Sequence, residues 1–144
     1  MQASRGYPDY SLKVCEAQNI PTDGSADVSG NAIDLKTTTP GFVGAGSAIT
    51  VVLTVTTALD TATTTTKLTI EVITDDNDSF SSATVIAPVG DIDIPTTAIA
   101  AGENYVWGLP TKTQDSYEQY LGIQMNPASN DLSAGAVNAW ILPR

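Results

Sequence analysis

Carboxylates are the side chains of this sequence best suited to acid–base chemistry. Glycosidases use two of them, one on each side of the sugar bond, and the spacing of the acids here does not exclude such a pair. A sugar cleft also needs aromatic walls, and the two tryptophans, Trp107 and Trp140, lie in predicted strands where packing or an interface role is expected. The sequence therefore favours a protein that is not an enzyme. The acids considered for a catalytic pair are Asp91, Asp93, Glu103 and Glu118.

Histidine is absent from all 144 residues. Its absence removes Ser-His-Asp and Cys-His nucleophiles and imidazole metal ligands. The single cysteine, Cys15, cannot form an intrachain disulfide, and one thiolate is too few for a zinc site. We expect Cys15 to be a buried apolar residue of the first strand; an intermolecular disulfide or a reactive thiol is the alternative. The glycines of residues 44–47 precede a predicted strand, which indicates a turn and not a phosphate-binding helix terminus.

The acidic segment 75–79 could hold calcium, because hard cations take several oxygens from one loop. It does not follow the EF-hand pattern. Counting from Asp75, the sixth position is Phe80 where glycine is needed, and the twelfth is Ile86 where glutamate is needed. A solvated turn between strands is the favoured interpretation, and a weak calcium site of another kind stays open. No cofactor is predicted.

The composition is typical of a β-protein with one domain. Hydrophobic residues make up 42% of the chain but aromatic residues only 6%, so the core must consist mainly of Ala, Val, Ile and Leu. Charged residues, at 15%, fall below the roughly 25% usual in soluble domains. Threonine is abundant, which favours half-buried pleated surfaces.

The net charge of -10 limits the choice of partners. Phosphate backbones and anionic membranes would repel the chain, so neither nucleic acid nor a membrane is a predicted partner. A protein surface with basic patches fits better. The first residues lack the apolar core of a signal peptide, and no apolar run approaches the roughly 18 residues that cross a bilayer, so we expect a soluble protein that is not exported.

Alternation of apolar and polar residues predicts short strands separated by turn residues. The clearest is 48–59, where Ile49, Val51 and Leu53 share one face. The spacing is typical of sandwiches. We therefore predict an all-β fold, a two-sheet antiparallel β-sandwich that is jelly-roll-like, over residues 11–144, preceded by an extended N-terminal arm over residues 1–10. The predicted strands are 12–17, 31–35, 48–59, 67–73, 83–87, 92–94, 104–109, 117–125 and 135–142.

Tyrosine suits an interface because it buries a large rigid ring and keeps one polar contact. Two tyrosines lie in the predicted arm, and two lie in the predicted strand 117–125. Tyr117 could instead cap the core of the sandwich. The candidate interface residues are Tyr7, Tyr10, Trp107, Tyr117 and Tyr120.

Patterns of small and apolar residues follow one another over residues 11–144 in an order that can be compared with known families. They are EAQ at 16–18, NAIDL at 31–35, the loop and strand at 44–55, LTIEVITDD at 68–76, SFSSAT at 79–84, YLGI at 120–123 and AGAV at 134–137. In this order they resemble the Bbp16-like capsid cement (decoration) proteins of tailed bacteriophages. The predicted arm and the uniform threonine run at 61–66 depart from the family.

The resemblance implies a jelly-roll-like sandwich on the outer surface of the phage head. There it would act as a symmetric oligomer, a dimer or a trimer, that stabilises contacts between capsomers. Its partners would be the major capsid protein and further copies of itself, and it would join the virion in the host cytoplasm. The alternative is a carbohydrate- or receptor-binding β-sandwich exposed on a virion, which Trp107 and Trp140 favour.

Overall fold

The computed structural model describes residues 12–35, 49–109 and 118–143, so the predicted arm over residues 1–10 lies outside the described residues. The described residues form nine strands and no α-helix. The strands are β1 (Lys13–Asn19), β2 (Asp27–Val28), β3 (Ile33–Asp34), β4 (Ile49–Thr61), β5 (Thr66–Asp75), β6 (Thr84–Ile94), β7 (Asn104–Leu109), β8 (Tyr120–Pro127) and β9 (Leu132–Pro143).

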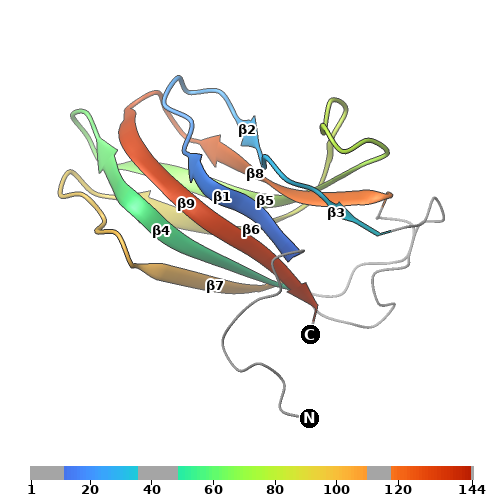
Figure 1. The fold of residues 1–144 in the computed structure, drawn as a ribbon. Helices are drawn as coiled ribbons and strands as arrows, with labels where there is room; N and C mark the ends of the chain where they lie inside the picture. The colour runs from blue at the N-terminus through green and yellow to red at the C-terminus, as the bar shows by residue number, and fades with distance from the viewer. Residues whose placement is uncertain (1–11, 36–48, 110–117, 144) are drawn as a thin grey trace, which may run out of the picture.

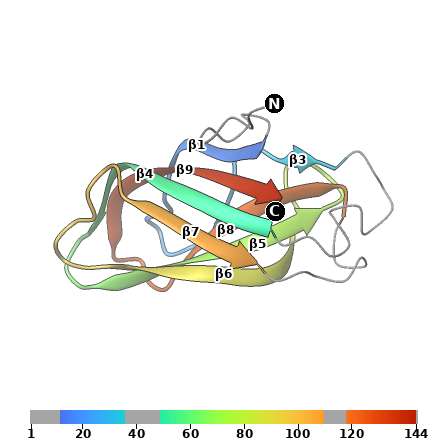
Figure 2. The same cartoon turned by 90° about the horizontal axis from the view of Figure 1, so that it is seen from below.

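Two antiparallel sheets pack face to face, as Figures 1 and 2 show. Sheet A has the order β1-β9-β4-β7; sheet B has the order β2-β8-β5-β6, with β3 also paired to β8. Of the strand pairs adjacent in sequence, only β5 and β6 are hydrogen-bonded neighbours, and most other connections cross between the sheets. This alternation is the jelly-roll arrangement. The predicted two-sheet β-sandwich is confirmed.

The core follows the alternation that the sequence shows. In β4, Ile49, Val51, Leu53 and Val55 are all buried, whereas the intervening residues are half-buried. Successive side chains of a strand point to opposite faces, so one face of β4 packs against sheet B and the other faces outward. The residues of sheet B that face β4 are also aliphatic, as the low aromatic content predicted. The largest fully buried side chains in sheet B are Leu68, Ile70, Ile73, Ile92, Ile94, Leu121, Ile123 and Met125.

The prediction of two strands on either side of Pro88 is wrong, because the structure has the single strand β6 there. β6 lies at the edge of sheet B, where a missing N–H need not interrupt the ladder. The register shifts between Ile70 and Glu71, opposite Pro88, so an irregularity accommodates the proline. The two-residue strand β2 was also missed, because two residues are too few to show a period.

Cys15 is fully buried in β1 and belongs to the hydrophobic core. Burial raises the pKa of its thiol to about 12, and the charge of Asp27 adds to the effect. The thiolate, which is the reactive form, is therefore scarce at neutral pH. The interpretation of Cys15 as a buried apolar residue is confirmed.

Candidate interaction surfaces

The outward side of sheet B carries carboxylates. In β6, Ile92 and Ile94 are buried, so the alternate residues Asp91 and Asp93 face solvent. In β5 the outward positions include Glu71, whose carboxylate accepts a hydrogen bond of 3.1 Å from the Gln124 amide of β8. We call this surface the acidic face. Its polar outward residues are Lys67, Thr69, Glu71, Asp91, Asp93, Gln124 and Asn126, and the apolar residues Val28 and Pro88 lie in the row of Glu71 and Gln124.

Asp91 is the most strongly held acid of this face. Its carboxylate accepts a 2.8 Å hydrogen bond from the Thr69 hydroxyl and lies 3.2 Å from the ammonium of Lys67. The Thr69 hydrogen bond, followed by the interactions with Lys67, holds the pKa of Asp91 below its usual value. Asp91 is thus ionised at neutral pH, and it keeps its charge in mild acid.

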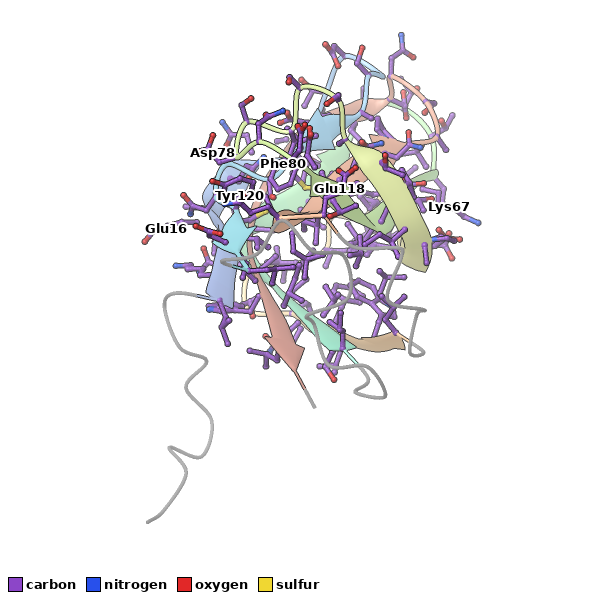
Figure 3. The ribbon with its side chains drawn as sticks, turned by 90° about the vertical axis from the view of Figure 1, so that its right-hand side faces the viewer. Glu16, Lys67, Asp78, Phe80, Glu118 and Tyr120 are labelled. Atoms are coloured by element: carbon purple, nitrogen blue, oxygen red, sulfur yellow. The ribbon has the colours of Figure 1, made fainter. Side chains whose placement is uncertain are left out.

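The four acids considered for a catalytic pair lie on three different elements. Asp91 and Asp93 lie on β6, Glu103 immediately precedes β7 of the other sheet, and Glu118 lies two residues before β8. In Figure 3, Glu118 lies on the end of the sandwich that faces the viewer, away from Lys67 on the acidic face. Only Asp91 and Asp93 share a surface, and both point outward from an edge strand.

The outward side of sheet A has a different character. Strand register aligns Lys13 of β1, Trp140 of β9, Val52 of β4 and Val106 of β7 in one row across all four strands. Val106 is 63% exposed, which makes it the most exposed large apolar side chain among the described residues. We call this surface the sheet A face. Its outward residues are Lys13, Thr50, Val52, Thr54, Asn104, Val106, Gly108, Asn138, Trp140 and Leu142, and the exposed Glu16 of β1 lies 3.4 Å from the ammonium of Lys13.

Trp140 is the largest side chain of the sheet A face. It is half-buried, and the ammonium of Lys13 lies 5.5 Å from the centroid of its ring. Such a cation–π contact covers part of the ring and leaves the rest available. Neither Trp140 nor Val106 packs against the core cluster. Val106 is not among the predicted interface residues, although the alternation in 104–109 places it on the face opposite Tyr105 and Trp107.

Trp107 lies on the inward side of β7. Its ring stacks on that of Tyr105, with centroids 5.6 Å apart, and both residues pack against the core. A side chain at Gly90 of β6 would clash with it, because an added Cβ would lie within 2.6 Å of three ring atoms of Trp107. Trp107 therefore fills the space between two edge strands of opposite sheets, which run beside each other in Figure 2. Burial, with the nearby charge of Glu103, raises the pKa of Tyr105.

The predicted interface residues do not gather in one place. Tyr7, Tyr10 and Tyr117 lie outside the described residues. Tyr120 lies in β8 of sheet B, half-buried, and its hydroxyl accepts a 3.2 Å hydrogen bond from the Gln119 amide. Trp107 lies in sheet A. The structure gives Trp107 a packing role, and an interface role for Tyr120 stays a prediction.

The acidic turn between β5 and β6 is held by Asp75. This residue is only 1% exposed, and its carboxylate accepts hydrogen bonds from the Asp76 amide (2.7 Å), the Ser82 amide (2.8 Å) and hydroxyl (3.0 Å), and the Asn77 side chain (3.1 Å). Burial raises the pKa of Asp75, but the hydrogen bonds from Ser82 and Asp76 outweigh it and the pKa is lowered. Protein donors thus occupy both oxygens, which favours a structural turn over a calcium site.

No group of three acids, or of acids with cysteine, is placed to hold a metal ion in the described parts of the chain. No helix in those parts is long and apolar enough to cross a membrane. A hollow of about 300 Å³ lies in the connection between β1 and β2, lined by eight residues between Asn19 and Asp27. None of the eight is aromatic, so neither tryptophan forms the wall of a sugar site there.

The threonine run between β4 and β5 is tied to the β8–β9 connection. Asp131 accepts hydrogen bonds from the hydroxyls of Thr63 (2.7 Å) and Thr64 (3.0 Å) and from the Thr64 amide (2.6 Å). The hydroxyl of Thr63 and the amide of Thr64 lower the pKa of Asp131 to about 2. Residues 62–65 therefore form an exposed loop with its conformation set by one carboxylate, whereas Thr61 and Thr66 are buried residues of β4 and β5.

Replacement of Asp75 by asparagine is expected to lower the free energy of unfolding by about 1–2 kcal/mol at pH 7, because an amide nitrogen cannot accept from the Ser82 donors. A carboxyl whose pKa is lowered on folding stabilises the fold above about pH 4, and the contribution is lost as the pH falls through the lowered value. The difference between wild type and Asp75→Asn should therefore shrink in acid. Urea denaturation at pH 7 and at about pH 2.5 measures this difference in the free energy of unfolding.

Asp78→Asn changes an exposed position in the same turn and is the control; its free energy of unfolding should stay close to that of wild type (Figure 3). An equal loss of stability for Asp75→Asn at both pH values would contradict the stabilising role of the ionised Asp75 carboxylate.

Comparison with known proteins gives one family. The family model Bbp16 matches residues 14–141, and no curated protein matches the chain. Among solved structures, recombinantly expressed latent aurone synthase (polyphenol oxidase) has a TM-score of 0.44 and 13% identity over 94% of this chain and 29% of its own. Latent aurone synthase co-crystallised with hexatungstotellurate(VI) and soaked in H2O2 also has a TM-score of 0.44, with 12% identity over 99% of this chain and 32% of its own. The chain spans less than a third of either enzyme chain, and likeness at this level bears on neither activity nor partners. Because the family model covers nearly all of the sandwich, the chain belongs to the Bbp16 family.

Proposed function

We propose that this protein is a capsid cement protein of a tailed bacteriophage. It binds the outer surface of the assembled head as a symmetric oligomer and stabilises contacts between capsomers. The observation that carries the proposal is membership of the Bbp16 family over residues 14–141, together with the order of sequence landmarks that resembles the cement proteins.

Cementing needs a protein that binds the assembled lattice better than free capsid subunits. Any ligand that prefers one state shifts the equilibrium toward that state. The jelly roll suits this task because long antiparallel pairings, such as that of β4 with β9 from Ile49 to Thr61, hold its surfaces in a fixed shape. A preformed surface loses little conformational entropy on docking.

The acidic face fits a capsid surface with basic patches. It presents Glu71, Asp91 and Asp93 with only Lys67 as a counter-charge, and Asp91 stays ionised because its pKa is lowered. Complementary charges raise the rate of association and fix the orientation of a docked partner. Binding through this face would weaken as salt is added.

The test is cosedimentation with expanded, undecorated heads of the phage that encodes the protein. We expect the pure protein to sediment with the heads, and we expect Asp93→Lys to weaken binding about tenfold, since it reverses one charge of the acidic face. Asp23→Lys makes the same change on the exposed β1–β2 connection and should bind within about threefold of wild type, which controls for net charge. Circular dichroism verifies that both variants fold.

Absence of wild-type protein from the sedimented heads would contradict the proposal. Binding to a glycan array that is lost on replacement of Trp107 or Trp140 would instead support the carbohydrate-binding alternative.

A further inference from the structure

We infer that an extended, basic segment of the capsid shell binds along β7 and adds a further strand to sheet A. The inference deepens the proposed function, on which it rests, by naming the contact and the form of the partner. β7 ends the strand order of sheet A, and β4 is its one hydrogen-bonded neighbour among the described strands (Figure 1).

The pairing with β4 leaves every second residue of β7 with backbone groups directed outward. The Val55 amide donates to the Glu103 carbonyl over 2.9 Å, and the register continues with Leu53 opposite Tyr105. Bonded pairs alternate in an antiparallel ladder, so the N–H and C=O groups of the intervening residues point away from β4. We call these groups the β7 edge. They belong to Asn104, Val106 and Gly108, and all three residues are exposed.

The other edges of the two sheets carry features that oppose the addition of a strand. β6 contains Pro88, two register shifts and the exposed residues Asp91 and Asp93. β1 has two register shifts, and its Ala17 has a φ of 43°. β2 and β3 have two residues each. β7 pairs with β4 in one continuous register and contains neither proline nor a charged side chain, so it is the edge best able to accept a strand.

Val106 marks the middle of the added strand. Its side chain is 63% exposed, and Val52 of β4 lies directly opposite it on the other side. An apolar residue of the added strand, placed opposite Val106, would bury both side chains, and such cross-strand pairs stabilise a sheet. The six residues of β7, at about 3.3 Å each, match a segment of about the same number of residues.

Charge selects the partner. Glu103 immediately precedes β7, and Asp91 follows Gly90 of β6, against which the ring of Trp107 packs. The potential around the β7 edge is therefore negative, and a second copy with its charge of -10 would be repelled. A segment with lysine or arginine beside its apolar residues would be attracted instead. The acidic face selects the same sign of charge, so one basic partner suits both surfaces.

Amide hydrogen exchange tests the geometry without any substitution. In the free protein, we expect the amides of the β7 edge to exchange at least about tenfold faster than those of Tyr105 and Trp107, which face β4. When undecorated heads are added, exchange in the peptide 104–109 should slow, because the added strand accepts from the outward amides. Mass spectrometry of the peptides measures this gain in protection.

Val106→Pro removes one N–H of the β7 edge and leaves the hydrogen bonds to β4 in place, since edge strands tolerate proline where the N–H faces solvent. In cosedimentation we expect this variant to bind undecorated heads at least about tenfold more weakly than wild type. Val106→Thr is the matched control. It keeps the N–H and the branched Cβ, so its binding should stay within about threefold of wild type. Circular dichroism and thermal denaturation show whether both variants keep the wild-type fold.

Three results would overturn the inference while the proposed function stands, provided that wild type sediments with heads. They are unchanged exchange of 104–109 on addition of heads, wild-type head binding by a folded Val106→Pro, and equal losses for Val106→Pro and Val106→Thr. Protection of 104–109 when the pure protein is concentrated without heads would assign the β7 edge to a second copy and would also contradict the inference. If wild type does not sediment with heads, the proposed function and the inference both fail.

Discussion

Replacement of Gly122 by alanine is expected to lower the free energy of unfolding by about 3 kcal/mol. Gly122 is buried in β8, and an added Cβ would lie 2.5 Å from the ring of Phe80 and 2.6 Å from the hydroxyl of Ser29. Neither neighbour can withdraw easily. Phe80 is 5% exposed with a φ of 53°, and the Ser29 hydroxyl accepts from the Ile123 amide and donates to the Asn31 carbonyl.

Urea denaturation of wild type and Gly122→Ala measures the loss, provided that the slope with denaturant stays unchanged. Gly30→Ala is the control, because the nearest side-chain atom to its added Cβ would be 3.6 Å away, an ordinary contact. Its stability should stay within about 1 kcal/mol of wild type. A loss below about 1 kcal/mol for Gly122→Ala would mean that Phe80 moves freely and that the acidic turn does not fix it.

Replacement of Trp107 by alanine is expected to cost about 2–3 kcal/mol of stability, somewhat less than for a fully buried tryptophan. The indole packs on Tyr105 and over Gly90, so its removal opens the gap between β6 and β7. Trp140→Ala is the matched control. Trp140 lies on the outward side of sheet A, so its loss should cost less stability.

Thermal and urea denaturation separate these roles when they are combined with sedimentation. The packing role of Trp107 is contradicted if Trp107→Ala unfolds like wild type and yet loses binding to a partner. That result would support the predicted interface role of Trp107. The same experiment tests the carbohydrate-binding alternative, since that function needs at least one tryptophan ring exposed to the ligand.

The acidic face makes the proposed head binding depend on salt. Binding of a basic surface through Glu71, Asp91 and Asp93 should weaken with salt. A salt series that follows head binding therefore tests the role of the acidic face.

The fold class and much of the core follow from local patterns in the sequence. The apolar residues of β4 alternate with threonine and valine, and this period of two can be satisfied only by a strand with one buried face. The absence of histidine and the isolation of Cys15 also follow from the sequence alone. These features are local, so each can be recognised from neighbouring residues.

Features that depend on residues distant in sequence could be seen only in the folded chain. Pro88 is tolerated within β6 because that strand is at an edge of sheet B. The row of Trp140, Val52 and Val106 exists only because β9, β4 and β7 pair in one register. Local alternation shows which face of a strand each side chain occupies, but it cannot show which strands are neighbours. Register between strands distant in sequence places these side chains together, and it therefore created this exposed apolar row.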